Sequence, residues 1–185
     1  MYEVRFHGRG GQGAVMGAEI LAKALIEEGK FAVTIPAFGF ERRGAPVQSY
    51  LKFDDKVIRQ HNNVRQPHCV VCIDPTVPNA VDIYQGMRAD GVAVLCTKKA
   101  LERLKLNPNV KKVAICDGVH IAMEIIGRPI TNTIMLGAFA KATGLVSLES
   151  INYAMGETAF RDAALEKNII AVKRGYDETT VYEIP

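Results

Sequence analysis

The chain has 185 residues, of which 48% are apolar, and carries a formal net charge of +3. This length and composition are typical of one medium domain with a real core. No run of Lys or Arg exceeds two residues, which argues against a nucleic-acid partner. No apolar stretch approaches the ~20 residues of a membrane span, and no signal peptide precedes the first charged strand. We therefore expect a cytoplasmic protein.

The first predicted unit is a strand, a glycine-rich turn and a helix. Residues 2–6 alternate apolar and polar, and residues 14–28 place four apolar residues on one helical stripe. The intervening segment reads His-Gly-Arg-Gly-Gly-Gln-Gly, in which Gly8, Gly10 and Gly13 satisfy the G-x-G-x-x-G pattern. Glycines let the backbone approach an anion, and a helix N-terminus favours negative charge. The segment predicts phosphate binding, and the alternative is a turn that only packs helix on sheet.

The second strand differs from that of an NAD site. An NAD site places a carboxylate at the tip of this strand to bind the ribose hydroxyls, whereas residues 31–35 are followed by Pro36. The loop that comes next, residues 37–46, carries Arg42 and Arg43. Arginine forks suit phosphate oxygens, so a nucleotide with an extra ribose phosphate, such as NADP or coenzyme A, fits better. The alternative is that both arginines are solvated or face a protein partner.

The middle of the chain predicts alternating strands and helices with one antiparallel insertion. Residues 48–53 and 57–59 flank Asp54-Asp55-Lys56, which is a hairpin signal. Strands are then expected at 70–73, 92–95 and 112–116, and short helices at 80–84 and 98–104. This order of elements is typical of an α/β fold.

The last third is predicted to be helical. Helices are expected at 118–126, 132–142, 148–155 and within 157–174, with breaks at Gly127-Arg128-Pro129 and Gly144 and a cap at Ser147. No linker rich in Pro, Ser or Gly divides the chain. The sequence thus predicts an α/β fold: a single three-layer Rossmann-like domain over residues 1–185, with a mixed sheet and a helical C-terminal portion.

Candidates for catalysis or metal binding are few. The C-x-x-C segment Cys69–Cys72 lies in an apolar run, and residues three apart in a strand point to opposite faces, so these cysteines are expected to be core thiols. His7 and His120 have no evident partner and are expected to be structural. Asp74 and Asp117 follow strands, where they either contact a ligand or serve turn and cap chemistry. We expect neither catalytic nor metal-ligating residues, which indicates a binding subunit that works with other chains.

The ordered segments 7–13, 38–47 and 70–75, with 132–137 beyond them, identify a resemblance. Together they resemble the gamma subunit of 2-oxoacid:ferredoxin (acceptor) oxidoreductases, whose best-known branch is the pyruvate synthase family. The similarity runs over essentially the entire chain. Residues 41–44 read Glu-Arg-Arg-Gly, where many relatives carry a small or hydroxylated residue at the second arginine, which leaves the substrate branch open.

The resemblance implies a heteromeric enzyme that cleaves a 2-oxo acid, releases carbon dioxide and joins the acyl group to coenzyme A. Electrons pass to ferredoxin or another acceptor. It places thiamine diphosphate between alpha and beta subunits, and iron–sulfur clusters in beta or ferredoxin-like delta subunits. In related enzymes the domain equivalent to gamma is implicated in handling coenzyme A. The isolated chain is then expected to be inactive.

These inferences meet at one candidate site for coenzyme A. The backbone N–H groups of Gly10 to Gly13 are expected to hold phosphate oxygens, and arginines add charge. Gln12 either orients the loop or touches the ligand, and Phe38 and Phe40 are candidates for packing against alpha. Two alternatives stay open: a stand-alone NADP-binding reductase, and a purely architectural subunit. The candidate cofactor-binding residues are Gly8, Arg9, Gly10, Gly11, Gln12, Gly13, Arg42 and Arg43.

Overall fold

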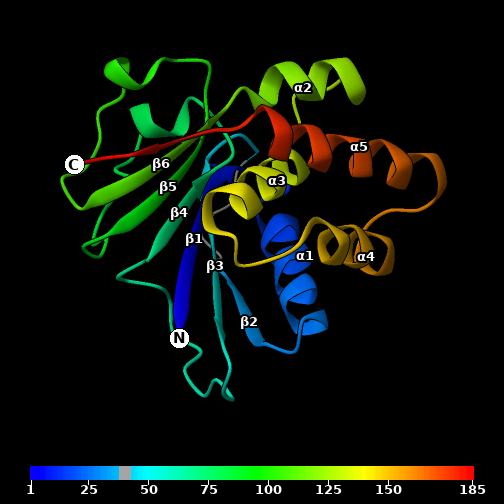
Figure 1. The fold of residues 1–185 in the computed structure, drawn as a ribbon, viewed down its shortest axis with the longest axis horizontal. Coiled ribbons are helices and arrows are strands. Elements are labelled where there is room, and N and C mark those ends of the chain that lie inside the picture. The colour runs from blue at the N-terminus through cyan, green and yellow to red at the C-terminus, as the bar shows by residue number, and fades with distance from the viewer. Residues whose placement is uncertain (38–42) are drawn as a thin grey trace.

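In the computed structural model, which describes residues 1–37 and 43–185, the chain forms seven strands and five α-helices (Figure 1). The strands are β1 (Tyr2–Arg9), β2 (Phe31–Pro36), β3 (Pro46–Asp54), β4 (Cys69–Cys72), β5 (Gly91–Cys96), β6 (Val110–Cys116) and β7 (Thr180–Glu183). The helices are α1 (Ala14–Glu27), α2 (Gly118–Ile125), α3 (Asn132–Thr143), α4 (Leu148–Thr158) and α5 (Asp162–Glu178), with short 3-10 turns η1 (Val77–Asn79) and η2 (Leu101–Arg103). The predicted α/β class and helical C-terminal portion are confirmed.

The strands form one mixed sheet in the order β2-β3-β1-β4-β5-β6-β7. The neighbours β1, β4, β5 and β6 are parallel, whereas β3 is antiparallel to both β1 and β2, and β7 is antiparallel to β6. From β1 the chain passes through α1 toward β2, and from β4 it passes the other way, toward β5. The direction of winding therefore reverses between β1 and β4. In open α/β sheets this reversal is where ligands bind.

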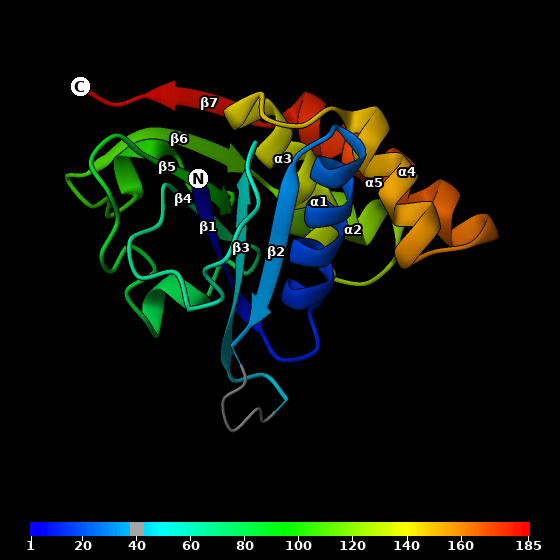
Figure 2. The same ribbon diagram turned by 90° about the horizontal axis from the view of Figure 1, so that it is seen from below.

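The helices lie on one face of the sheet (Figure 2). Helices α1 and α3 pack directly on the strands, while α5 packs on α3 and α4 packs on α1. Helix α3 is buried along most of its length because the sheet and α5 cover it. A Cβ at Gly137 would collide with the carbonyl of Val172, and one at Gly175 with the carbonyl of Ile134. Two glycines without side chains thus allow α3 and α5 to pack at close range.

The opposite face is covered by irregular segments that contain η1 and η2. Their apolar residues, among them Ile83 and Met87, form a second core against Val70, Leu95 and Val113 of the sheet. Each face of the sheet therefore has its own apolar core, with helices over one and irregular chain over the other. This accounts for the apolar runs of β4 and β5, which are buried on both faces.

Three sequence predictions of secondary structure are wrong. Residues 57–59 do not pair with β3, because β2 and β1 already occupy both hydrogen-bonding edges of that strand. No helix forms at 80–84, which lie in turns after η1 ends at Asn79, and the helix expected at 98–104 is only the three-residue turn η2. Strand β7 was not predicted.

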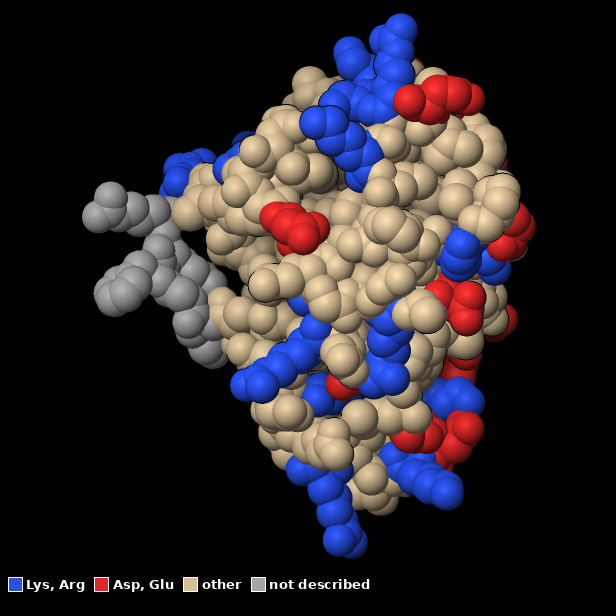
Figure 3. Space-filling view, turned by 90° about the vertical axis from the view of Figure 1, so that its left-hand side faces the viewer, with Lys and Arg blue, Asp and Glu red and all other residues tan. Residues whose placement is uncertain are grey.

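Charged side chains are dispersed on the face drawn in Figure 3. Lys and Arg lie there in separate groups, with Asp and Glu among them. This view therefore contains no single continuous basic patch. It agrees with the modest net charge of the sequence.

Candidate functional site

The glycine loop lies at the carboxyl end of β1, where the sheet reverses its winding. Gly8 allows a close approach, because a Cβ there would lie 2.9 Å from the Ile73 side chain and 3.3 Å from Cβ of Ala14. Gly11 and Gly13 have φ of 89° and 80°, in the left-handed region that favours glycine. Helix α1 then begins directly after Gly13, without a side-chain cap. The predicted strand, glycine turn and helix are confirmed.

Only some amides of the loop are free to bind an anion. The N–H of Gly10 donates to the Ala45 carbonyl at 2.9 Å, and the N–H of Gln12 donates back within the loop at 3.1 Å. Among the described residues, no acceptor is recorded for the N–H groups of Gly11 and Gly13, nor for those of the first turn of α1. A helix leaves the N–H groups of its first turn unpaired, and they favour an anion. The available donors are therefore those of Gly11, Gly13 and α1.

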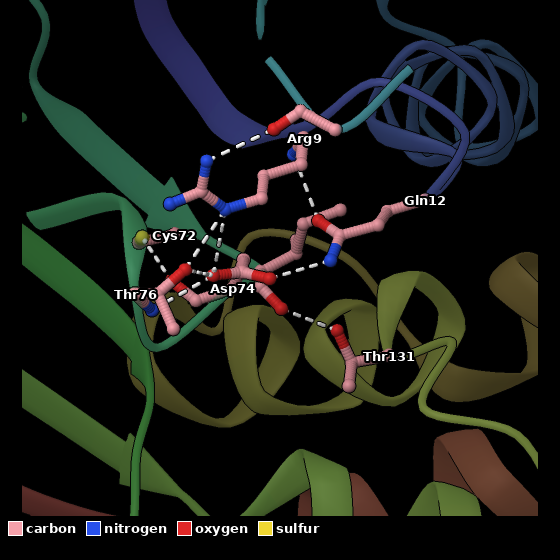
Figure 4. A network of polar contacts seen from close by, with 8 residues as sticks. Arg9, Gln12, Cys72, Asp74, Thr76 and Thr131 are labelled. Carbon is pink, nitrogen blue, oxygen red and sulfur yellow. Dashed lines mark hydrogen bonds and ion pairs between the residues drawn. The ribbon is translucent and has the colours of Figure 1, made fainter. Parts of the chain in front are cut away.

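Gln12 and Arg9 hold the loop in place (Figure 4). Oε1 of Gln12 accepts from the N–H of Arg9 at 2.8 Å, and Nε2 of Gln12 donates to Oδ2 of Asp74 at 2.5 Å. The Arg9 guanidinium donates to Oγ1 of Thr76 at 2.8 Å and to the carbonyl of Gly44 at 2.9 Å. Both side chains bond to neighbouring protein groups, so each orients the loop.

Asp74 is the acidic centre of this network. Its side chain is 11% exposed, and the Arg9 guanidinium lies 3.7 Å away. Oδ1 accepts from the N–H and the hydroxyl of Thr76. Burial by itself raises the pKa of this carboxyl, but the hydrogen bonds from Thr76 and Gln12 and the charge of Arg9 outweigh it, and the pKa lies below its ordinary value. Asp74 is therefore a carboxylate at neutral pH, joining the end of β4 to the glycine loop.

A hollow of about 610 Å³ opens beside the loop. Two arginines from distant parts of the sequence, Arg43 and Arg128, line it together with the loop backbone. Arg43 was predicted as a site residue, whereas Arg128 was read only as part of a helix break. Arg42 lies outside the described residues, as do Phe38 and Phe40. The lining residues are Gly10, Gly11, Gln12, Arg43, Arg128, Pro129 and Ile130.

A second helix begins next to the first. Asn132, the first residue of α3, donates from Nδ2 to the carbonyl of Gly13 at 3.3 Å. The preceding Thr131 donates from its hydroxyl to the carbonyl of Ile73 at 2.5 Å. The N-termini of α1 and α3 are thus joined, and both helix dipoles direct positive potential toward this region. Residues 132–137 carry part of the family resemblance, but their contact with the glycine loop could not be predicted from the sequence.

The two histidines singled out in the sequence have protein partners. Nε2 of His7 accepts from Nε of Arg5 at 3.1 Å. Burial lowers the pKa of His7 to about 3, so its imidazole is neutral. His120 lies on α2, exposed, 3.3 Å from Glu124. The Asp117 side chain caps α2 through the N–H of His120, so of the two alternatives for this residue the cap is the one observed.

The four cysteines are free and buried. Cys69 belongs to the core under the helices and Cys72 to the core on the other face, so the C-x-x-C pair does point to opposite sides of the sheet. Burial raises the pKa of the Cys72 thiol to about 12. Among the described residues, no group of three or more His, Cys, Asp or Glu is placed to hold a metal ion.

Comparison with known proteins identifies the family. The family model described as pyruvate ferredoxin/flavodoxin oxidoreductase matches residues 3–178. The chain belongs to this family. It is 57% identical over 184 residues to the gamma subunit of an NADH-dependent phenylglyoxylate dehydrogenase from Aromatoleum evansii, covering all of this chain and 97% of that one. It is 49% identical over 188 residues to the common gamma subunit of pyruvate/ketoisovalerate oxidoreductases from Pyrococcus furiosus, and each chain is covered completely.

Solved structures agree with this family assignment. The pyruvate oxidoreductase subunit PORC of Thermotoga maritima matches with a TM-score of 0.85 at 36% identity, over 98% of each chain. A 2-oxoglutarate:ferredoxin oxidoreductase from Magnetococcus marinus matches with a TM-score of 0.74 at 16% identity, over 95% of this chain and 30% of that one. The latter shares the fold, as one part of a longer chain.

The predicted resemblance is therefore confirmed: the chain is a gamma subunit of the 2-oxoacid:ferredoxin oxidoreductases, and so a subunit of a multi-subunit enzyme. In the part of the chain that the structure describes, no helix has the length and apolarity needed to span a bilayer.

Proposed function

We propose that this gamma subunit binds the phosphates of coenzyme A at its glycine loop. The observation that carries the proposal is the set of N–H groups at Gly11, Gly13 and the start of α1 that have no acceptor among the described residues. Gly11 lines the same hollow as Arg43 and Arg128. Amides at a helix N-terminus together with guanidinium groups are the donors that phosphate prefers. Arg9, which the sequence predicted as a further ligand of the phosphates, takes a positioning role instead.

Coenzyme A satisfies this donor set at more than one point, since it carries a diphosphate and a ribose phosphate. The acyl acceptor of the reaction proposed for the complex is the same molecule. The relative from Magnetococcus marinus is described with coenzyme A and succinyl-CoA bound. NADP offers similar phosphates, but a reductase needs a proton donor near the nicotinamide, and the sequence has no Tyr-x-x-x-Lys pair.

The complex that we propose is a cytoplasmic assembly of this chain with alpha and beta subunits, and in some branches a ferredoxin-like delta subunit. It oxidatively decarboxylates a 2-oxo acid to an acyl-CoA and passes electrons to ferredoxin or another acceptor. When bound in the partner chains, thiamine diphosphate supplies the decarboxylation chemistry and iron–sulfur clusters supply the electron path. The cysteines of this chain do not fit a cluster, because Cys69 and Cys72 face opposite cores.

The choice of 2-oxo acid is proposed to lie in the partner subunits. The relative from Pyrococcus furiosus is named as one gamma subunit common to pyruvate and ketoisovalerate oxidoreductases, and the relative from Aromatoleum evansii serves a phenylglyoxylate dehydrogenase. Gamma subunits that are 57% and 49% identical to this chain thus accompany oxo acids of different shape. A role in binding the shared co-substrate is consistent with this.

The test is steady-state kinetics of the assembled enzyme. Arg43→Gln combined with Arg128→Gln should raise the KM for coenzyme A about tenfold or more, since a hydrogen bond to a charged group contributes about 1.5–3 kcal/mol. The KM for the 2-oxo acid should stay within about twofold. Arg59→Gln combined with Arg103→Gln, at two exposed arginines that do not line the hollow, is the control of equal charge.

Unchanged dependence on coenzyme A in the double variant would favour the architectural alternative. Binding of NADPH by the purified chain, followed by its fluorescence, would favour the reductase alternative. Either result contradicts the proposal.

A further inference from the structure

A second cavity lies over β1 and β3, on the face of the sheet that the helices do not cover. Its volume is about 510 Å³. It shares no lining residue with the hollow at the glycine loop. The sheet and two irregular segments line it. The sheet contributes Arg5, Gln48 and Tyr50, the first segment Asn63, Val64, Arg65 and Gln66, and the second segment Gln85 and Gly86.

The guanidinium of Arg5 is a buried charge in the wall of this cavity. The residue is 5% exposed. Its Nη2 donates to the carbonyls of Ile83 and Gln85 at 3.0 and 2.6 Å, and its Nε donates to His7 at 3.1 Å. No carboxylate of the described residues forms an ion pair with Arg5, and no acceptor is recorded there for Nη1. Buried charges are ordinarily paired. The negative charge of Asp82 acts on Arg5 without forming an ion pair with it, so Arg5 lacks a direct counter-ion.

A neighbouring pair on the same face shows how the fold treats another buried cation. Lys52 is 1% exposed, and its Nζ lies 3.3 Å from Oε1 of Glu3, its direct partner across the β1–β3 register. Two residues further along, the partner of Arg5 in the same register is Tyr50. The sheet therefore supplies a carboxylate to one buried cation and a neutral phenol to the other.

The remaining lining adds donors to the cavity and no carboxylate. His7, which accepts from Arg5 through Nε2, is not part of the lining, and burial keeps its imidazole neutral by lowering its pKa. The Tyr50 hydroxyl donates to Oε1 of Gln48 at 2.8 Å, which leaves the amide hydrogens of Gln48 as donors. Arg65 is exposed at the rim. The lining thus combines two cations with several neutral amides.

The walls of the cavity are held together by backbone contacts. Gly86 has φ of 72°, and a Cβ there would collide with the carbonyl of Arg65. The N–H of Arg88 donates to the carbonyl of Pro67 at 3.1 Å. The two irregular segments are therefore fixed against each other, and the cavity is formed before any ligand enters.

We propose that this cavity is a carboxylate-binding site, in which Arg5 is the buried anchor and Arg65 adds charge at the rim. A carboxylate matches the planar fork of an arginine. It has two sources: a small free carboxylate such as an organic acid, or an Asp or Glu side chain inserted by a partner subunit. Both supply the missing counter-ion of Arg5.

The test is calorimetric titration of sodium malonate into the full-length chain and into the assembled enzyme, at neutral pH and constant ionic strength. The isolated chain should bind malonate saturably and should not bind neutral malonamide. Arg5→Gln should weaken binding at least tenfold and Arg65→Gln severalfold, while Arg59→Gln, which removes an equal charge outside the cavity, should leave binding unchanged.

The assembled enzyme separates the two sources. Binding that depends on Arg5 in both the chain and the assembly identifies a free carboxylate, whereas binding by the isolated chain alone identifies a partner side chain. No saturable binding by the isolated chain, equal binding of malonamide, or equal affinity in Arg65→Gln and Arg59→Gln overturns the proposal. Circular dichroism will show whether Arg5→Gln folds. If it does not, the affinity of Arg65→Gln relative to Arg59→Gln and the response to malonamide still test the proposal.

Discussion

Replacing Gln12 by leucine tests whether this side chain fixes the glycine loop. The change removes a neutral hydrogen bond from the N–H of Arg9 and a charged one to Asp74. The first contributes about 1 kcal/mol and the second about 1.5–3 kcal/mol. Because both groups are only partly buried, water replaces some of this loss. We expect the free energy of unfolding to fall by about 2–3 kcal/mol, which lowers Tm by about 4–12 °C in a chain of this size.

The assay is urea unfolding at pH 7 of the wild-type chain, Gln12→Leu, Asp74→Asn and the double variant. The cycle should give a coupling of about 0.5–3 kcal/mol between the two side chains, as for residues within one network. The native pKa of Asp74 lies below its ordinary value. The carboxylate therefore adds stability above about pH 4, and that stability is lost as the pH falls through the native pKa.

The destabilisation by Gln12→Leu should accordingly be smaller near pH 3 than at pH 7, because the lost bond favoured the ionised form. A free energy of unfolding within about 0.5 kcal/mol of wild type at pH 7, the range of an ordinary surface substitution, would refute the assigned role of Gln12. So would additivity of the two substitutions.

Three further predictions concern the rest of the fold. Glu3→Gln should destabilise the chain by about 3–5 kcal/mol in denaturant unfolding, because it leaves Lys52 as a buried charge without its carboxylate; a loss below about 1 kcal/mol contradicts this. Gly137→Ala should lower the free energy of unfolding by about 1–3 kcal/mol or more, because it forces α3 away from Val172. An unchanged Tm would be inconsistent with the close packing of α3 and α5. The four cysteine thiols are buried, and burial raises the pKa of Cys96 to about 12. They should therefore resist iodoacetamide at pH 8 until the chain unfolds. Rapid labelling of the native chain would count against their burial.

The parts of the fold that local sequence determines could be predicted. The glycine turn between β1 and α1 was found because its residues are contiguous and their conformational needs are local. The cap at Ser147 and the left-handed Gly144 at the end of α3 were found for the same reason. The hairpin after β3 was wrong because the true partner of β3 on one side, β2, lies earlier in the chain.

The network around the loop could not be predicted, because its members are far apart in sequence. Gln12 meets Asp74 across 62 positions, and Asn132 meets Gly13 across 119. Arg128 follows a helix and precedes a proline, so locally it reads only as a break. The N–H groups of Gly10 to Gly13 were all expected to face a ligand, but that of Gly10 donates to Ala45 and that of Gln12 to Arg9, which leaves those of Gly11 and Gly13.

A structure of the assembled enzyme with coenzyme A bound tests the proposed phosphate site most directly. We predict phosphate oxygens within about 2.7–3.2 Å of the amide nitrogens of Gly11 and Gly13, the usual range for such hydrogen bonds, with Arg128 also in contact. Coenzyme A bound in the assembly with no phosphate at this loop, or the hollow filled by a partner's side chains, would contradict it.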